Sequence, residues 1–116
     1  MPTLKLSSIV CEVPEESDKD EIYLKFRDKK IWPQKGKYQQ IDTDETLHIG
    51  LSIKIERTGT LKLDLWEYDL TSKDDHLGVF QLEITSLDPG RFTELLVRDE
   101  EGAERASYYI NWEIRE

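Results

Sequence analysis

The chain has 116 residues, of which 16 are basic and 25 acidic, and its formal net charge is -9. This length suits one domain with a sizeable core, and the acidic balance argues against nucleic-acid binding, which needs positive charge to neutralise phosphates. The single cysteine, Cys11, excludes an internal disulfide, and its apolar neighbours predict a small residue of the core or sheet.

The dominant pattern along the chain is alternation of apolar and polar residues, which is typical of strands. Leu61, Leu63 and Leu65, for example, alternate with Lys62 and Asp64. The pattern predicts eight strands, at residues 3–13, 21–28, 38–42, 46–56, 59–69, 77–86, 91–97 and 104–115, and no helix longer than a turn or two. One apolar face per strand predicts an all-β fold, an eight-stranded antiparallel β-sandwich that forms a single domain over residues 1–116.

No apolar run at the N-terminus resembles a signal peptide, and no stretch is long and apolar enough to be a transmembrane segment. We therefore expect a cytoplasmic protein, with peripheral attachment to a membrane or export without a signal peptide left open.

Acidic residues concentrate in alternate connections between the predicted strands. Successive antiparallel strands reverse direction, so the first, third, fifth and seventh connections should share one end of the sandwich, which would then hold fifteen of the 25 acidic residues. The second connection, residues 28–37, carries four lysines and is expected at the opposite end. Like charges packed at one end repel one another, and a cation or a basic partner would relieve that repulsion.

The most informative motif is the fifth connection, Trp66-Glu67-Tyr68-Asp69-Leu70-Thr71-Ser72-Lys73-Asp74-Asp75-His76-Leu77-Gly78. Carboxylates at alternate positions end one strand, a short polar loop follows, and a further acidic pair precedes the next strand. Such an arrangement aims several oxygens at one point, as a hard cation such as Ca²⁺ requires.

This motif resembles the third calcium-binding loop of a C2 domain, with Leu77-Gly78 in the position of the closing apolar-glycine pair. The opening of the second strand, Glu21-Ile22-Tyr23-Leu24-Lys25, is similar to the segment that follows the first calcium loop of that family. The resemblance covers most of the chain and implies a C2-like Greek key. It also implies a set of calcium ligands, with three neighbouring carboxylates able to substitute. The implied ligands are Glu15, Glu21, Glu67, Asp69 and Asp75, and the substitutes are Asp18, Asp20 and Asp74. Glutamate stands where the family has aspartate at three of these positions, and isoleucine replaces the usual proline at Ile22.

The basic segment at residues 25–37 has two interpretations. It is either a solvated strand edge and loop or a contact surface for a protein partner or an anionic lipid headgroup, which the resemblance also suggests. The candidate contact residues are Lys25, Arg27, Lys29, Lys30 and Trp32. Trp32 itself is expected either to anchor the loop to the core or to form an exposed contact.

The chain offers little support for other chemistry. His48 and His76 are isolated, with no zinc-binding spacing, and no nucleophile motif, phosphate loop or small-molecule substrate site is recognisable. We therefore expect a non-enzymatic module whose acidic loops bind Ca²⁺ and mediate docking to a membrane or a protein. The alternative is a calcium-independent interaction module or a subunit of a larger assembly.

Overall fold

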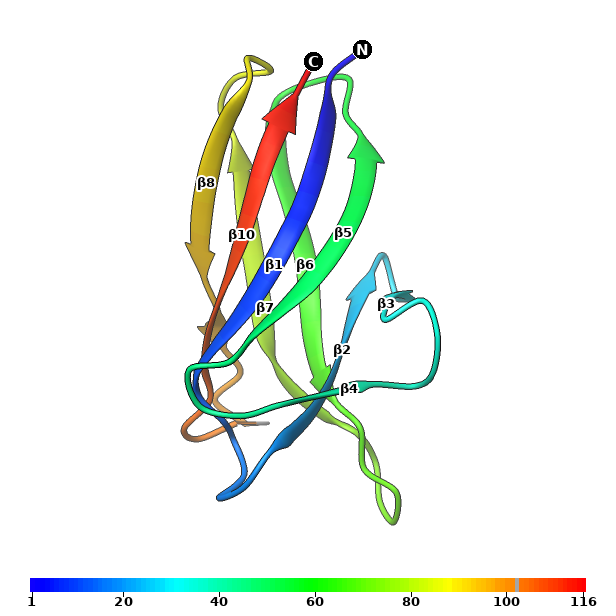
Figure 1. Cartoon of the computed structure of the whole chain (residues 1–116), viewed down its shortest axis with the longest axis vertical. Coiled ribbons are helices and arrows are strands. Elements are labelled where there is room, and N and C mark those ends of the chain that lie inside the picture. Colours follow the sequence, from blue (N-terminus) through cyan, green and yellow to red (C-terminus); the bar gives the residue numbers. More distant parts are fainter. Residues whose placement is uncertain (102) are drawn as a thin grey trace.

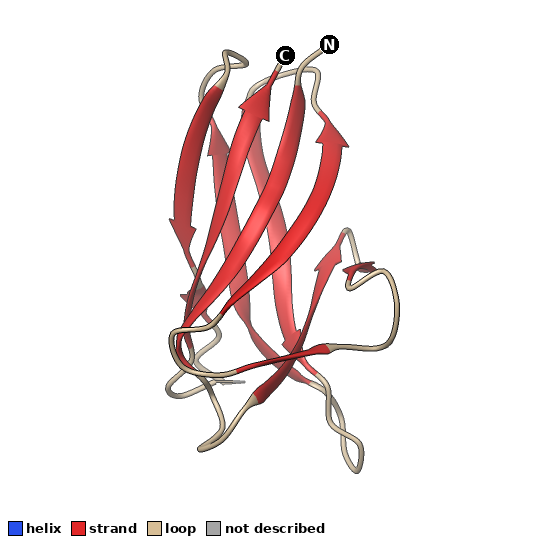
Figure 2. Ribbon diagram, in the orientation of Figure 1, coloured by secondary structure: helices blue, strands red, loops and turns tan. Residues whose placement is uncertain are grey.

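The computed structural model describes residues 1–101 and 103–116 as two antiparallel sheets packed face to face (Figure 1; Figure 2). The strands are β1 (Thr3–Val13), β2 (Asp20–Phe26), β3 (Lys29–Trp32), β4 (Gln39–Ile41), β5 (Thr46–Lys54), β6 (Gly59–Glu67), β7 (Asp75–Ile84), β8 (Gly90–Leu95), β9 (Val97–Arg98) and β10 (Ser107–Arg115). None of the described residues is helical. The predicted all-β sandwich is thus confirmed.

One sheet has the order β5-β1-β10-β8, and the other has the order β3-β2-β6-β7-β9 with β4 also paired to β2. Strands distant in the sequence lie side by side, because β1 pairs with β10 and β2 pairs with β6. Most of the connections between strands are thereby gathered at the two ends of the sandwich, and those on either side of β3 lie along its side (Figure 1).

The core lies between the sheets and is built from the inward phase of each strand. Leu63 and Leu65 of β6 and Ile110 of β10 are fully buried, as is Cys11 on β1, in line with its expected core position. Each fully buried aliphatic side chain stabilises the fold by roughly 1.5–3 kcal/mol. The core therefore holds the strand ends, and the loops between them, in a defined arrangement.

Two short strands were not predicted. β3 forms a hairpin with β2 through Arg27 and Asp28, which both have positive φ angles, 52° and 68°. Two consecutive residues in this conformation make the tight turn whose twist matches that of paired strands. β9 pairs with β7 beside Gly78, where an added Cβ would lie 2.3 Å from the carbonyl oxygen of Val97, so only glycine allows this approach.

The expected position of the lysine-rich segment is wrong. β2 has only seven residues, so its hairpin with β3 reverses halfway along the sandwich. The chain then returns to β4, which pairs with Asp20–Ile22 at the acidic end (Figure 1). The segment therefore runs along the side of the six-stranded sheet and not at the end opposite the acidic loops.

Candidate functional site

The four acidic connections meet at one end of the sandwich, the lower end in Figure 1, as their order along the chain predicted. Backbone hydrogen bonds hold them to one another and to the strands. Cys11 and Asp44 link the third connection to β1, with distances of 3.0 Å from the Cys11 amide to the Glu45 carbonyl and 2.7 Å from the Asp44 amide to the Cys11 carbonyl. The amide of Tyr68 donates to the carbonyl of Glu21 at 2.7 Å.

Asp20, at the start of β2, closes the first of these loops. Its side chain is fully buried and accepts hydrogen bonds from the amides of Glu15 (2.7 Å) and Glu16 (3.0 Å). The hydroxyl of Tyr108, on β10 of the other sheet, also donates to it at 2.5 Å. A buried carboxylate with three donors is well compensated. Asp20 therefore has a structural role that ties the two sheets together at this end.

Glu15 is also engaged by the backbone. Its carboxylate accepts hydrogen bonds from the amides of Glu104 (3.0 Å), Arg105 (2.9 Å) and Ala106 (3.0 Å) in the segment before β10. It thus fastens the first acidic connection to the seventh. The residue that the C2 resemblance suggested as a first-loop ligand holds loop backbone in this structure.

Glu67, the last residue of β6, is in a different situation. Its side chain is 2% exposed, and neither carboxylate oxygen makes a hydrogen bond of normal geometry, although the Asp20 carboxyl and the Glu21 backbone lie close enough to influence its pKa. Burial and the negative charge of nearby Asp20 raise its pKa to about 9. A buried charge without a partner is strongly destabilising, so this carboxyl must carry a proton or face a cation.

The rest of the fifth connection is organised by its own carboxylates. Asp69 accepts hydrogen bonds from the amide of Thr71 (3.0 Å) and the hydroxyl of Ser72 (2.8 Å), and these bonds lower its pKa. Asp74 accepts from the amide of Asp69 at 2.9 Å and from the hydroxyl of Tyr23. Asp75 is the first residue of β7 and is exposed.

Several of these carboxylates lie close enough to shift one another's pKa values. Partial desolvation and the charge of Asp69 raise the pKa of Asp75. Desolvation, followed by the charges of Asp20 and Glu21, raises the pKa of Glu16, and Asp69 and Asp75 add to this effect. Glu16 was not among the predicted site residues, and only its position next to Glu15 in the acidic loop pointed to it. Asp18, one of the suggested substitutes, is exposed, and Glu21 is half-buried.

The chemistry of these donors suits a hard cation, because they are all carboxylate oxygens. The buried carboxylate of Glu67, whose oxygens make no hydrogen bond of normal geometry, is the observation that fits a bound cation best. However, no three His, Cys, Asp or Glu side chains among residues 1–101 and 103–116 form a group ready to hold a metal ion. The carboxylate ligands that a hard cation prefers are therefore present, but they are not arranged as a formed metal site.

The structure places the five predicted contact residues in different environments. Trp32 is only 5% exposed and packs in the core, so its alternative role as an exposed contact is wrong. Its side chain points inward because β3 pairs with β2 opposite Leu24, a core residue. Lys30 donates to the carbonyls of Pro33 (2.8 Å) and Gly36 (2.5 Å) and so braces its own loop.

The other three basic residues lie on the side of the six-stranded sheet. The ammonium of Lys25 lies over the Trp66 ring, 4.8 Å from its centroid, and the Arg27 guanidinium is 5.0 Å from that of Phe26. Lys29 is exposed. These cations are spread over one edge of the sheet and remain a prediction as a contact surface.

His76 lies just outside the predicted strand at residues 77–86, whereas the structure places it in β7 between two carboxylates. Its Nε2 is 2.9 Å from Asp64 and its Nδ1 is 2.6 Å from Asp99, while Trp66 packs against the ring at 4.9 Å. The cluster joins β6 and β7 to the connection before β10. No spacing in the sequence indicated that these residues meet.

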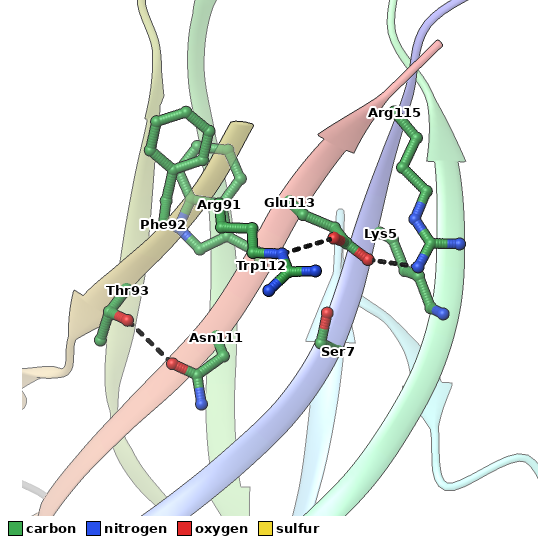
Figure 3. A pocket seen from close by; sticks show the side chains of 9 residues that line it. All are labelled: Lys5, Ser7, Arg91, Phe92, Thr93, Asn111, Trp112, Glu113 and Arg115. Atoms are coloured by element: carbon green, nitrogen blue, oxygen red, sulfur yellow. Dashed lines mark hydrogen bonds and ion pairs between the residues drawn. The ribbon is translucent and has the colours of Figure 1, made fainter. Parts of the chain in front are cut away.

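A hollow lies on the outer face of the four-stranded sheet, away from the acidic loops (Figure 3). Its basic side chains are Lys5, Arg91 and Arg115, and Glu113 stands among them. Arg115 contacts the Glu113 carboxylate at 2.7 Å and Arg91 at 3.8 Å. Two of the three cations are therefore occupied within the protein, which leaves little free positive charge for an anionic ligand.

No protein-family model matches this chain, and no curated protein matches it. Among solved structures, the chain is similar to a C2 domain of plant extended synaptotagmin 1, with a TM-score of 0.54 and 13% sequence identity. The match covers 97% of this chain and 90% of that domain. At this identity the likeness shows the fold alone: the chain has a C2-like fold, as its motifs predicted. In the part of the chain that the structure describes, no helix is long and apolar enough to span a membrane.

Proposed function

We propose that this chain is a non-enzymatic C2-like docking module that takes Ca²⁺ at its acidic end. The observation that carries the proposal is the buried carboxylate of Glu67, whose two oxygens make no hydrogen bond of normal geometry and whose pKa is raised by burial and by the charge of another carboxyl group, Asp20. Removing a charged carboxylate from water costs several kcal/mol unless a counter-charge is present. A divalent cation would supply that charge.

The residues that would hold the ion come from both acidic loops. Glu21, Glu67, Asp69 and Asp75 belong to the predicted set, and Glu16 lies close enough to be influenced by the same group of charges. Glu15 and Asp20 are better regarded as supports, because backbone amides and Tyr108 already occupy their oxygens. Calcium prefers six to eight oxygens, so carbonyl groups and water would complete its shell.

Cation binding would change the electrostatic character of this end. Mutual repulsion among the carboxylates would fall, and the negative potential would move towards neutral. That change would allow the acidic end to approach an anionic membrane surface or a protein partner, with Lys25, Arg27 and Lys29 on the adjacent side of the sheet.

A calorimetric titration of the chelator-treated chain with Ca²⁺, with Mg²⁺ as the control, tests the proposal. Binding at micromolar to sub-millimolar Ca²⁺ that Mg²⁺ does not reproduce supports it, and Ca²⁺ should then raise the melting temperature by mass action. The double variant Asp69→Asn with Asp75→Asn should abolish both effects. Asp88→Asn is the matched control and should keep them, because Asp88 is an exposed acid in the connection between β7 and β8, and this connection lies at the end opposite the acidic loops (Figure 1).

The calcium-independent interaction module is the second candidate. It is favoured by the hydrogen bonds of Glu15 and Asp20, which hold the first and seventh connections together without a metal ion. Under this alternative, millimolar Ca²⁺ produces neither heat nor stabilisation, and the Asp69→Asn and Asp75→Asn substitutions leave stability unchanged or raise it by relieving repulsion.

A further inference from the structure

β6 lacks a neighbouring strand along half of one side. It pairs with β7 along its whole length, from Gly59↔Ile84 to Glu67↔Asp75. Its pairing with β2 on the other side covers only Asp64–Glu67 and ends at the Lys25↔Asp64 pair. Among residues 1–101 and 103–116, no strand pairs with residues 59–63 on that side.

The gap is visible in the ribbon, where the hairpin of β2 and β3 stops halfway along the sandwich while β6 continues to its upper end (Figure 1; Figure 2). It exists because β2 turns back after seven residues. An unpaired strand segment offers backbone amides and carbonyls to any extended chain that lies beside it.

A groove lies along this unpaired segment, between β6 and the end of β5. Its floor is apolar and consists of core or near-core side chains. These are Phe26, Ile53, Ile55, Leu61 and Ile84. Such a floor would accept apolar side chains from an added strand.

The rim of the groove is predominantly basic. It carries four cations, Arg27, Lys54, Arg57 and Lys62, against two acids, Glu56 and Asp64. This local excess of positive charge stands out in a chain whose net charge is -9. It would attract an acidic segment and discriminate against a basic one.

We propose that the gap beside β6 receives an extended acidic segment of a partner protein as an additional strand of the six-stranded sheet. Five residues of β6 are unpaired, which corresponds to a bound segment of roughly 17 Å at about 3.3 Å per residue. Alternate residues of that segment would face inward to the apolar floor and outward towards Lys62, because Leu61 is buried and Lys62 is exposed on β6. The main-chain hydrogen bonds would supply affinity, and the alternation of acidic and apolar residues would supply selectivity.

This site does not depend on the proposed calcium site. The two lie at different ends of β6, with Glu67 at one end and Gly59 at the other. Peptide binding measured in the presence of chelator therefore tests the groove alone, and its failure would leave the calcium proposal untouched.

The probe is a short peptide of alternating glutamate and valine, titrated into the isotope-labelled full chain. We expect amide shifts and slower hydrogen exchange within residues 59–63. The same peptide with alternate backbone nitrogens methylated should lose this protection, because it cannot complete the ladder. A peptide of alternating lysine and valine should bind at least about tenfold more weakly.

The variant Lys62→Glu should weaken binding of the acidic peptide by about tenfold, since it places like charges opposite each other. Lys35→Glu, an exposed lysine in the connection between β3 and β4 that does not line the groove, is the matched control and should leave binding unchanged. If Lys62→Glu fails to fold, the methylated peptide and hydrogen exchange on the unaltered chain still decide the question.

Four results would overturn the proposal. These are the absence of binding at millimolar peptide, equal binding of the lysine peptide, protection that maps to β5 or β8, and protection of residues 59–63 by self-association without peptide. The last result would show that a second copy of the chain fills the gap.

Discussion

The substitution Glu67→Gln should make the protein more stable at neutral pH and should remove part of its pH dependence. Glutamine has nearly the same shape as glutamate but stays neutral, so it does not place a charge at this buried position. The pKa of Glu67 is raised from 4.5 to about 9 in the folded state. The folded state thus holds a proton that the unfolded state releases between these values.

The sign follows from linkage. A carboxyl whose pKa is raised on folding contributes its full stability below pH 4.5, and this contribution is lost as the pH rises towards about 9. Each pH unit above the unfolded-state pKa lowers the free energy of unfolding by about 1.4 kcal/mol, so the protein loses about 3 kcal/mol of stability by pH 7. Relative to the unaltered protein, Glu67→Gln should therefore gain about 3 kcal/mol between pH 4.5 and pH 7.

Urea unfolding of both proteins at several pH values, in the presence of chelator, measures this difference. Other titrating groups are shared by the two proteins and largely cancel. A difference that stays constant across the pH range would refute the reasoning, because it would mean that Glu67 titrates alike in the folded and unfolded states. With saturating Ca²⁺ the order should reverse if the proposed site is correct, since only the glutamate binds the ion strongly.

Three further changes test the structural account. Tyr108→Phe removes a donor from the buried Asp20 and should cost about 1–3 kcal/mol of unfolding free energy in a denaturant titration, with little change if that hydrogen bond is absent. Gly78→Ala places a methyl group 2.3 Å from the backbone of β9 and should cost about 1–3 kcal/mol, and an unchanged melting temperature would contradict the close approach. The thiol of Cys11 is fully buried, and its pKa is raised to about 11, chiefly by desolvation. It should therefore react with a thiol reagent only when the protein unfolds. Rapid labelling of the native protein would exclude this burial.

The fold was predictable because alternation of apolar residues reports burial directly. The inward positions of β6 and β10 are those that the pattern marked, and the shared end of the acidic connections follows from antiparallel order alone. The short β3 and β9 escaped this reasoning. β3 depends on a tight turn at Arg27 and Asp28, two residues without the glycine that usually signals such a turn, and β9 is only two residues long.

The candidate site was less predictable because spacing indicates where a carboxylate lies along the chain but not which donors it meets. Glu15 stands at the spacing of a calcium ligand, yet three backbone amides from the other end of the sequence occupy its carboxylate. His76 meets Asp99 through a contact between β7 and the connection before β10. Long-range contacts of this kind depend on loop conformation, which has no periodic signature.

One buried feature of the acidic end was nevertheless encoded in the strand phase. Leu61, Leu63 and Leu65 point inward along β6, and continuing this alternation by two residues places Glu67 inward as well. The same phase on β2 takes Ile22 back to Asp20. Two neighbouring strands thus each end their inward face with a carboxyl group, so the core closes at this end on acids instead of apolar side chains. Tyr108 and the loop amides compensate Asp20, and Glu67 is left to a proton or a cation. The proton and the cation must then compete, so the apparent affinity for Ca²⁺ at this end should rise with pH.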